Sequence, residues 1–292
     1  MNYIETQQKT AQQALIKSIQ ANFGLFFIKL ISGIFGQSFA LVADAIESLS
    51  DVVSSLLVLF GLKYASKPAD KNHPYGHGKA EPIVTMIVVL FLIGSATLII
   101  IQSIKNIGTP HESPKKFTLV ILGIIIISKE ILFQFMKNKA SKTGSSSLLA
   151  DAWHHRADAI TSVAAFIGIS FSIYMGKGFE SADDYAALFA AIVIVFNAIK
   201  LAKPAVSEIM DENNYPDLMN QLIVLTEKTP GAIEVEKCFI RKHGMTYFVD
   251  MHLVVDGNIS VRDGHEIAHL VKRNIQHDLP YITEMMIHIE PN

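Results

Sequence analysis

Cysteine, charge and catalytic motifs are all scarce in this chain of 292 residues. Its one cysteine, Cys238, excludes an internal disulfide framework. Charged residues make up only 18% of the chain and the net charge is -2, so nothing indicates nucleic acid as a partner. Neither a nucleophile with a positioned base nor a phosphate-binding glycine loop is recognisable, so an enzyme is the least expected class and no prosthetic group is predicted.

Apolar residues are abundant instead. They form 50% of the chain, more than is usual for a soluble domain, and most of the excess lies before about residue 204. A helix needs about 20 apolar residues to cross a bilayer, and six such spans can be placed. The predicted spans are 13–35, 39–64, 81–104, 117–137, 146–173 and 184–203. Because Met1 to Lys9 is polar and the first apolar run is long, no cleavable signal peptide is expected.

Lysines near the ends of these spans indicate an orientation. They are more numerous after the second, fourth and sixth spans than on the opposite side, which favours a cytoplasmic N-terminus. An even number of spans places the C-terminus on the same side. We therefore expect a multi-pass protein of the lipid bilayer, in the cell (inner) membrane, with both termini in the cytoplasm.

Two of the predicted spans carry the same polar pattern. Ionisable residues spaced i, i+3 and i+7 share one face of a helix, and both spans have such a set. The two sets are Asp44, Glu47, Asp51 and Asp151, His154, Asp158. A carboxylate at the centre of a membrane helix costs about 3 kcal/mol, so these groups need compensation.

A shared cation would provide that compensation. Glu47, Asp51, His154 and Asp158 form a set of oxygen and nitrogen donors that suits a divalent metal such as zinc, and also tolerates iron, cobalt or manganese. His155 competes with His154 for the role of ligand. The alternative is a structural ion-pair network in which the counter-charge comes from Lys29, Lys129 or Arg156.

A second cluster follows the second span. Asp70, His73 and His77 are close enough in sequence to converge on one ion, although Pro74 and Gly76 disfavour a regular helix there. The alternative is a polar turn without a metal.

Residues 1–204 are predicted to form the transmembrane domain, and residues 205–292 have the pattern of a soluble domain. The expected elements are a helix over 215–228, strands over 234–241 and 247–255, a helix to about 278 and a strand over 284–290. Ser260 and Asp263 are spaced as a capping box for the second helix. The order α-β-β-α-β predicts a small α+β sandwich.

Alternation along two of these strands separates core from surface. Tyr247, Val249, Met251 and Leu253 form one apolar face, which places His252 on the other. In the last strand, His288 and Glu290 likewise lie opposite the apolar set. These ligands face away from the expected core, and His265 on the intervening helix would join them if that face lies at a subunit boundary. Solvated surface histidines are the alternative.

The motifs His73-Pro74-Tyr75-Gly76-His77-Gly78-Lys79-Ala80-Glu81 and His154-His155-Arg156-Ala157-Asp158-Ala159 resemble those of the cation diffusion facilitators, a family of dimeric divalent-metal/proton antiporters. The resemblance runs over nearly the whole chain. It implies a six-helix membrane bundle followed by a metallochaperone-like, ferredoxin-like cytoplasmic domain.

The resemblance also implies roles for individual residues. The membrane ligands map to Glu47 with Asp51 and to His154 with Asp158, and the loop ligands map to Asp70, His73 and His77. The cytoplasmic ligands map to His252, His265, His288 and Glu290. The resemblance also implies a salt bridge between Lys79 and Asp211.

Two positions depart from the family pattern. Ile233 stands where some relatives have a histidine, which reduces the expected cytoplasmic site. Glu47 stands where aspartate or histidine is usual, at a position associated with metal preference, so the sequence does not select one metal. Zinc and ferrous iron are the leading expectations, followed by manganese, cobalt and cadmium.

The expected function is export of a divalent cation from the cytoplasm in exchange for protons, by alternating access in a homodimer. A passive metal pore would use the same ligands without proton coupling. A membrane-anchored metal sensor or assembly protein would bind metal in its cytoplasmic domain without transporting it.

Overall fold

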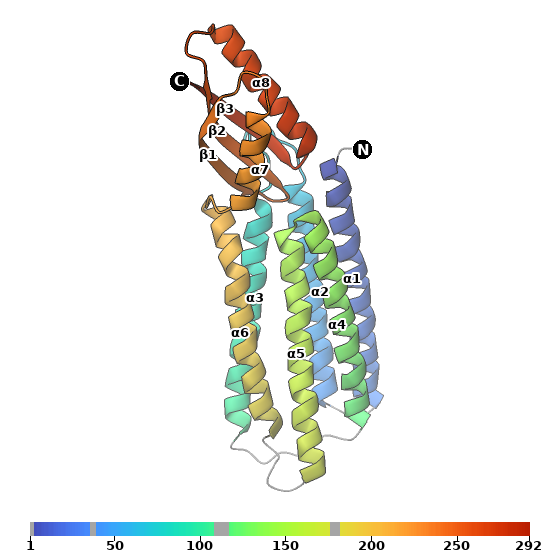
Figure 1. Ribbon diagram of the computed structural model, residues 1–292. Coiled ribbons are helices and arrows are strands. Elements are labelled where there is room, and N and C mark those ends of the chain that lie inside the picture. The colour runs from blue at the N-terminus through green and yellow to red at the C-terminus, as the bar shows by residue number, and fades with distance from the viewer. Residues whose placement is uncertain (1–2, 36–38, 108–116, 176–181) are drawn as a thin grey trace.

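The computed structural model describes residues 3–35, 39–107, 117–175 and 182–292. A bundle of long helices carries a small α/β domain at one end, and the N-terminal end of α1 lies at that same end (Figure 1). The helices of the bundle are α1 (Tyr3–Phe35), α2 (Phe39–Ala65), α3 (Ala80–Asn106), α4 (Phe117–Thr143), α5 (Ser146–Met175) and α6 (Ala182–Ile209). The predicted fold class, a helical membrane domain followed by an α/β domain, is confirmed.

The bundle exposes apolar side chains on its surface and buries several polar side chains in its interior. Large apolar side chains such as Leu90, Ile127 and Phe196 are exposed on its surface, whereas Asn22, Asp51 and Lys129 are buried within it. That distribution fits a bilayer, which solvates apolar side chains and leaves polar ones to be satisfied within the protein. Among the described residues, three helical segments are long and apolar enough to cross a membrane: Tyr3–Ile31, Ala80–Lys105 and Leu119–Thr143. The count of six spans stays a prediction.

Small residues let the helices of the bundle approach one another closely. α1 packs on α2, α4 on α5, and α3 on α6. Ala152, Ala157, Ala191 and Ala198 are buried in the core of the bundle, and small residues are typical of helix interfaces in membranes. At Gly61 on α2 an added Cβ would lie 2.4 Å from Cγ2 of Val84 on α3, so a larger residue there would push these helices apart.

The small domain has the predicted order of elements. They are α7 (Pro216–Glu227), β1 (Glu234–His243), β2 (Thr246–Val255), α8 (Val261–Asp278) and β3 (Ile282–Pro291). The strands lie in the order β1-β2-β3, with β1 antiparallel and β3 parallel to β2. The predicted capping box is present, because the Ser260 side chain accepts from the Asp263 amide and the Asp263 carboxylate accepts from the Ser260 amide.

One face of this sheet forms the core of the small domain, as the alternation predicts. Val249, Met251 and Leu253 of β2 are fully buried, and they pack with Val271 and Ile275 of α8. Burying each such side chain contributes about 1.5–3 kcal/mol. The opposite face carries His252 and His288, which leaves their imidazoles available for other contacts.

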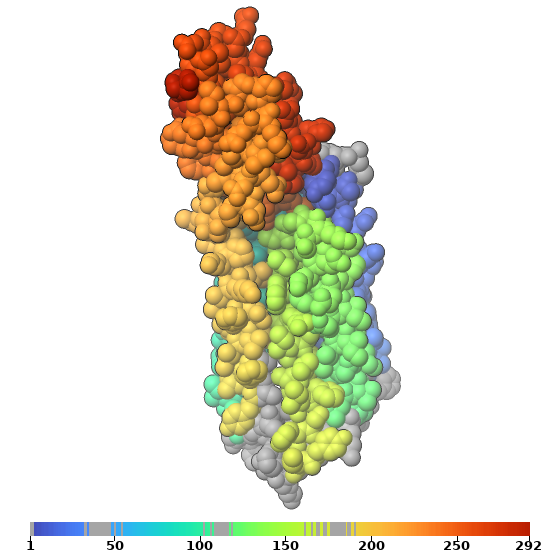
Figure 2. All heavy atoms as spheres, in the orientation of Figure 1, coloured from blue at the N-terminus to red at the C-terminus, as the bar shows by residue number. Residues whose placement is uncertain are grey.

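The two domains meet at the turn between β1 and β2. Figure 2 shows the small domain as a separate head seated on the end of the bundle. At the junction, Glu208 near the end of α6 accepts hydrogen bonds from the Gly244 amide at 2.8 Å and from Lys242 Nζ at 3.2 Å. α6 runs past Pro204 to Ile209, so a continuous helix reaches from the bundle to this turn.

Candidate metal centre

Asp51, His154 and Asp158 meet inside the bundle. Each offers one ligand atom, and these atoms all lie within 4.8 Å of one another. His154 Nε2 is 2.8 Å from Asp51 Oδ1, and both residues are buried. Around a zinc ion, with bonds of about 2.0–2.2 Å, tetrahedral ligand atoms lie about 3.5 Å apart, so small shifts would bring these donors to coordination distance.

The helices explain why these three residues meet. His154 and Asp158 are one turn apart on α5, so they share a face, and α5 packs on α2, which carries Asp51. Glu47 lies one turn before Asp51 on α2, but its side chain is outside the described residues. Its role as a fourth ligand therefore stays a prediction.

Lys129 of α4 adds a cation to this group. Its Nζ donates to Asp51 Oδ2 at 2.8 Å, to Asp158 Oδ2 at 2.8 Å and to Asn22 Oδ1 of α1 at 3.2 Å. Of the other predicted counter-charges, Arg156 pairs with Glu130 and Lys29 donates to Ser48 Oγ. Asp51, His154, Asp158 and Lys129 together form the pocket of the bundle. The pocket fits both interpretations of the sequence, the metal site and the ion-pair network, because the donors that suit a metal also pair with Lys129.

His155 points into a different polar network. Its Nε2 is 2.7 Å from Ser18 Oγ and 3.4 Å from Asp151 Oδ2, and Ser55 Oγ donates to Asp151 Oδ1 at 2.7 Å. Of the two competing histidines, His154 is therefore the one that contacts Asp51. The sequence prediction missed Ser18, Asn22 and Ser55, whose only signal was a polar side chain within an apolar helix.

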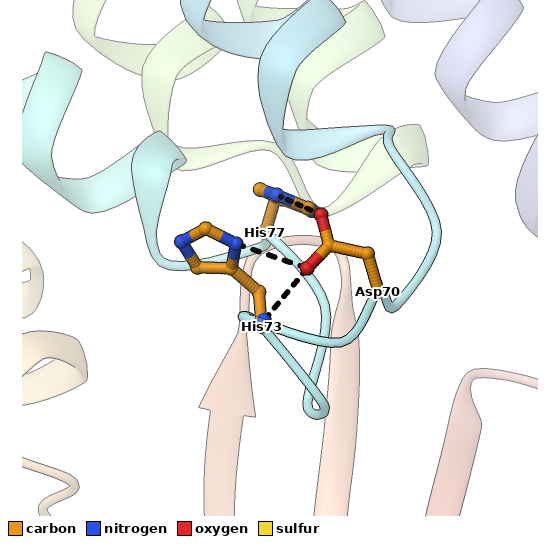
Figure 3. A group of neighbouring side chains, drawn as sticks. All are labelled: Asp70, His73 and His77. Carbon is orange, nitrogen blue, oxygen red and sulfur yellow. Dashed lines mark hydrogen bonds and ion pairs between the residues drawn. The ribbon is translucent and has the colours of Figure 1, made fainter.

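Asp70, His73 and His77 also come together, in the loop between α2 and α3, where their side chains point toward one another (Figure 3). The Asp70 carboxylate lies 3.2 Å from His73 Nδ1 and 3.4 Å from His77 Nε2. It also accepts from the His73 amide at 2.7 Å and the Asn72 amide at 2.9 Å. The His73 amide, with help from that of Asn72, holds the pKa of Asp70 below its usual range, which keeps a charged ligand in the loop.

The loop cluster abuts the small domain. The Gly78 amide, one residue after His77, donates to His243 Nε2 at 3.0 Å, and His243 stacks on Phe248. An added Cβ on Gly78 would lie 2.3 Å from the His243 ring, so glycine is needed for this close approach. Burial, with Lys79 nearby, lowers the pKa of His243, which favours the neutral imidazole that can accept this hydrogen bond.

His252, His288 and Glu290 form the third group. His252 pairs with His288 in the register of β2 and β3, and Glu290 Oε1 lies 3.0 Å from His252 Nδ1 and 3.3 Å from His288 Nε2. Glu236, which the sequence prediction did not single out, approaches His252 Nδ1 at 3.8 Å. His265 lies on α8 beside His269, with ring centroids 4.4 Å apart, and its predicted role at a subunit boundary stays a prediction.

The predicted pair of Lys79 and Asp211 is confirmed. Lys79 Nζ forms an ion pair with the Asp211 carboxylate and also donates to the Glu208 carbonyl oxygen at 2.5 Å. Asp211 has a φ of 54°, a left-handed conformation that aspartate tolerates better than most residues. The pair therefore joins the loop before α3 to the segment after α6.

Comparison with known proteins gives matches over both domains. Residues 15–210 match the family model of the cation efflux transmembrane domain, and residues 215–292 match that of the cation efflux protein cytoplasmic domain. The chain is 31% identical over 291 residues to the manganese efflux system protein MneP of Bacillus subtilis, covering 98% of both chains. It is 28% identical over 270 residues to the cation-efflux pump FieF of Yersinia pestis, covering 91% of this chain and 88% of that one.

Two further proteins are similar. The magnetosome protein MamB of Magnetospirillum gryphiswaldense is 29% identical over 272 residues, covering 93% of this chain and 91% of that one. A solved structure of the MamM CTD is 23% identical, with a TM-score of 0.27 over 27% of this chain and 100% of that one. From the two family models and the near full-length match to MneP, it follows that this chain belongs to the cation diffusion facilitator family.

Proposed function

We propose that this protein exports a divalent metal ion from the cytoplasm in exchange for protons. The observation that carries this proposal is the convergence of Asp51, His154 and Asp158 inside a bundle whose surface is apolar. Carboxylates buried in a membrane bundle are costly, and a group of them with an imidazole suits an exchangeable dication. The metal efflux proteins among its relatives support the same function.

The exchange follows from the chemistry of the ligands. Carboxylates and imidazole bind a metal in their deprotonated forms, so metal entry from the cytoplasm is coupled to proton loss. After the helices move, protons from the far side displace the metal outward. Each pH unit of gradient contributes about 1.4 kcal/mol per proton, so exchange of even one proton can drive export.

The other predictions fit the same scheme. Both termini lie in the cytoplasm of a protein embedded in the cell (inner) membrane, which places the small domain and the Asp70, His73 and His77 group where cytoplasmic metal is available. Two copies of the chain form a homodimer through their cytoplasmic domains. His252, His288 and Glu290, with His265 at the boundary, hold a structural or regulatory metal there.

The proposal also concerns which metal is transported. Two carboxylates and one imidazole, with Glu47 as a further oxygen donor, accommodate manganese, ferrous iron and zinc. Zinc and iron are the expectations from the sequence, and MneP is named for manganese efflux. These three metals, with cobalt and cadmium, form the panel to be tested.

The test is metal uptake into proteoliposomes under an imposed pH gradient, with internal pH recorded at the same time. We expect uptake of at least one metal, with proton movement in the opposite direction, and loss of both in Asp51→Ala and Asp158→Ala. Asp217→Ala, which alters an exposed carboxylate on α7, is the matched control and should resemble the wild type.

Other outcomes would separate the rival functions. Metal flux that ignores the pH gradient would identify a passive pore. Metal binding without any flux would identify a sensor or assembly protein. Wild-type flux in Asp51→Ala or Asp158→Ala would refute the assignment of the pocket.

A further inference from the structure

Lys129 contacts the carboxylates that would bind a transported metal. Its side chain is one of the largest that are fully buried, and its ammonium bonds one carboxylate on α2 and one on α5. These are Asp51 and Asp158, the same carboxylates that would hold a metal together with His154. A dication bound to them would lie within a few ångströms of the ammonium, and their like charges would repel.

We infer that Lys129 is a tethered competitor of the transported metal. Its ammonium neutralises Asp51 and Asp158 while the carrier moves without cargo, and an arriving dication displaces it from them. This inference rests on the proposed transport function. It adds a residue that controls metal binding, metal release and the return of the carrier without metal.

Competition with a tethered cation predicts a preference for divalent over monovalent ions. A group held beside its partners acts at a high effective concentration, so a free ion has to outcompete it. A monovalent ion brings the same charge as the ammonium and gains little by replacing it. A dication brings twice the charge and is attracted about twice as strongly to the two carboxylates.

The same competition helps release and return. A transport site has to bind its ion well enough to load and weakly enough to unload. Any carboxylate that the exchanged protons leave charged would oppose the return movement, because burying uncompensated charge is costly. Lys129 supplies that compensation, and its flexible four-carbon stem lets the ammonium leave the carboxylates when metal enters. Asn22 Oδ1, at 3.2 Å, is a neutral acceptor on a third helix that can keep hold of it.

The experiment compares two transport modes in proteoliposomes that contain the full chain. Net uptake requires the carrier to return without metal, whereas exchange of labelled for unlabelled metal does not. In Lys129→Met we expect net uptake to fall about tenfold or more relative to exchange, and the metal concentration for half-maximal exchange to fall by a similar factor. Monovalent cations should inhibit exchange more strongly in this variant than in the wild type.

Two control variants accompany it. Lys129→Arg keeps the charge and should keep a ratio of net uptake to exchange near that of the wild type. Lys137→Met makes the same substitution at an exposed position of the same helix and should change neither mode. Asp51→Asn should lose both modes, and if it does not, the transport pocket itself is misassigned.

The experiment can refute the inference about Lys129 without refuting the assignment of the pocket. A wild-type ratio and a wild-type half-maximal concentration in Lys129→Met, with both modes lost in Asp51→Asn, would overturn it and leave the transport function in place. Loss of both modes in Lys129→Met and in Lys129→Arg would also overturn it, because the lysine would then be needed for the fold rather than for the pocket without metal.

Discussion

The pocket in the bundle and the two groups outside it use the same kinds of side chain in different surroundings. Asp51 and His154 are buried and share their pocket with the ammonium of Lys129. Asp70 and His73, in contrast, have side chains that are 52% and 50% exposed. Among the described residues, the ion pairs within the loop and strand groups join histidines to carboxylates.

This difference bears on what each group can do with a metal. A metal that binds in the bundle, as we propose, would have to displace a buried ammonium, which favours exchange. Water reaches the carboxylates of the other two groups, because the side chains of Asp70 and Glu290 are 52% and 31% exposed, so these groups could hold or sense a metal without such a competitor. The loop and strand groups are therefore suited to a metal ion that stays bound, and the pocket to a metal ion that is bound and released during transport.

The largest expected effect separates two adjacent histidines. His154→Ala removes a donor next to Asp51 and should reduce metal transport about a hundredfold or more. His155→Ala leaves Asp151 buried with fewer partners, so it should lower the free energy of unfolding by about 2 kcal/mol while the folded protein still transports. Uptake in proteoliposomes and thermal unfolding in detergent measure the two effects. The reverse pattern would make His155 the ligand.

The contrast between these histidines also shows where sequence reasoning ended. Spacing along one helix places His154 and Asp158 on a common face, but it does not give the rotation of that helix against its neighbours. In soluble helices an apolar stripe indicates this rotation, whereas in a membrane bundle the outer face is apolar as well. For the same reason Lys129 could be named as a counter-charge but not chosen over Lys29 or Arg156.

A smaller effect is expected at the loop, where Asp70 has two roles. Asp70→Asn keeps an oxygen that can accept from the amides of residues 72 and 73, but it loses the charge. Asp70→Ala loses both. Metal affinity of the loop should fall about tenfold or more in both variants, whereas hydrogen exchange of residues 70–77 should increase only in Asp70→Ala. Metal titration and hydrogen-exchange mass spectrometry test this, and equal exchange in the two variants would contradict it.

The strand group should affect binding more than transport. In His288→Ala, His252 and Glu290 keep their contact at 3.0 Å but lose the third donor. Metal at about 100 times its Kd should stabilise the wild-type domain by about 2.7 kcal/mol, a chelator should remove that gain, and the variant should lack most of it. His277→Ala, at an exposed histidine on α8, is the control. A loss of transport as large as that in His154→Ala would remove the distinction between the pocket and the strand group.

The small domain was the part most fully predictable from sequence. Its strands alternate with period two and have one buried face, and its second helix opens with a capping box, so each local signal agrees with the fold. The pairing of His252 with His288 could not be predicted in this way, because it depends on the register between β2 and β3. The contact of His243 with Gly78 could not be predicted either, because it joins residues 165 positions apart.

The smallest expected effect concerns that contact and depends on pH. The pKa of His243 is lowered from its ordinary value of 6.5, chiefly by burial, so the docked imidazole is neutral and its Nε2 accepts from the Gly78 amide. A group with a lowered pKa takes up a proton when the contact opens, so docking is strongest above about pH 6.5 and weakens as the pH falls below it. The change should amount to about 1 kcal/mol, the contribution of one hydrogen bond.

Hydrogen exchange of residues 76–81 at pH 7.5 and 5.5, corrected for the intrinsic rate, measures this opening. His243→Gln can still accept from the Gly78 amide but does not titrate, so its corrected protection should not change with pH. Lys79, Asp211, Arg241 and His77 also act on His243 electrostatically and are common to both proteins, so the difference between the two isolates the imidazole. An equal pH dependence in the two would assign the effect to those neighbours, and the loop group would then be linked to the small domain through charge rather than through this hydrogen bond.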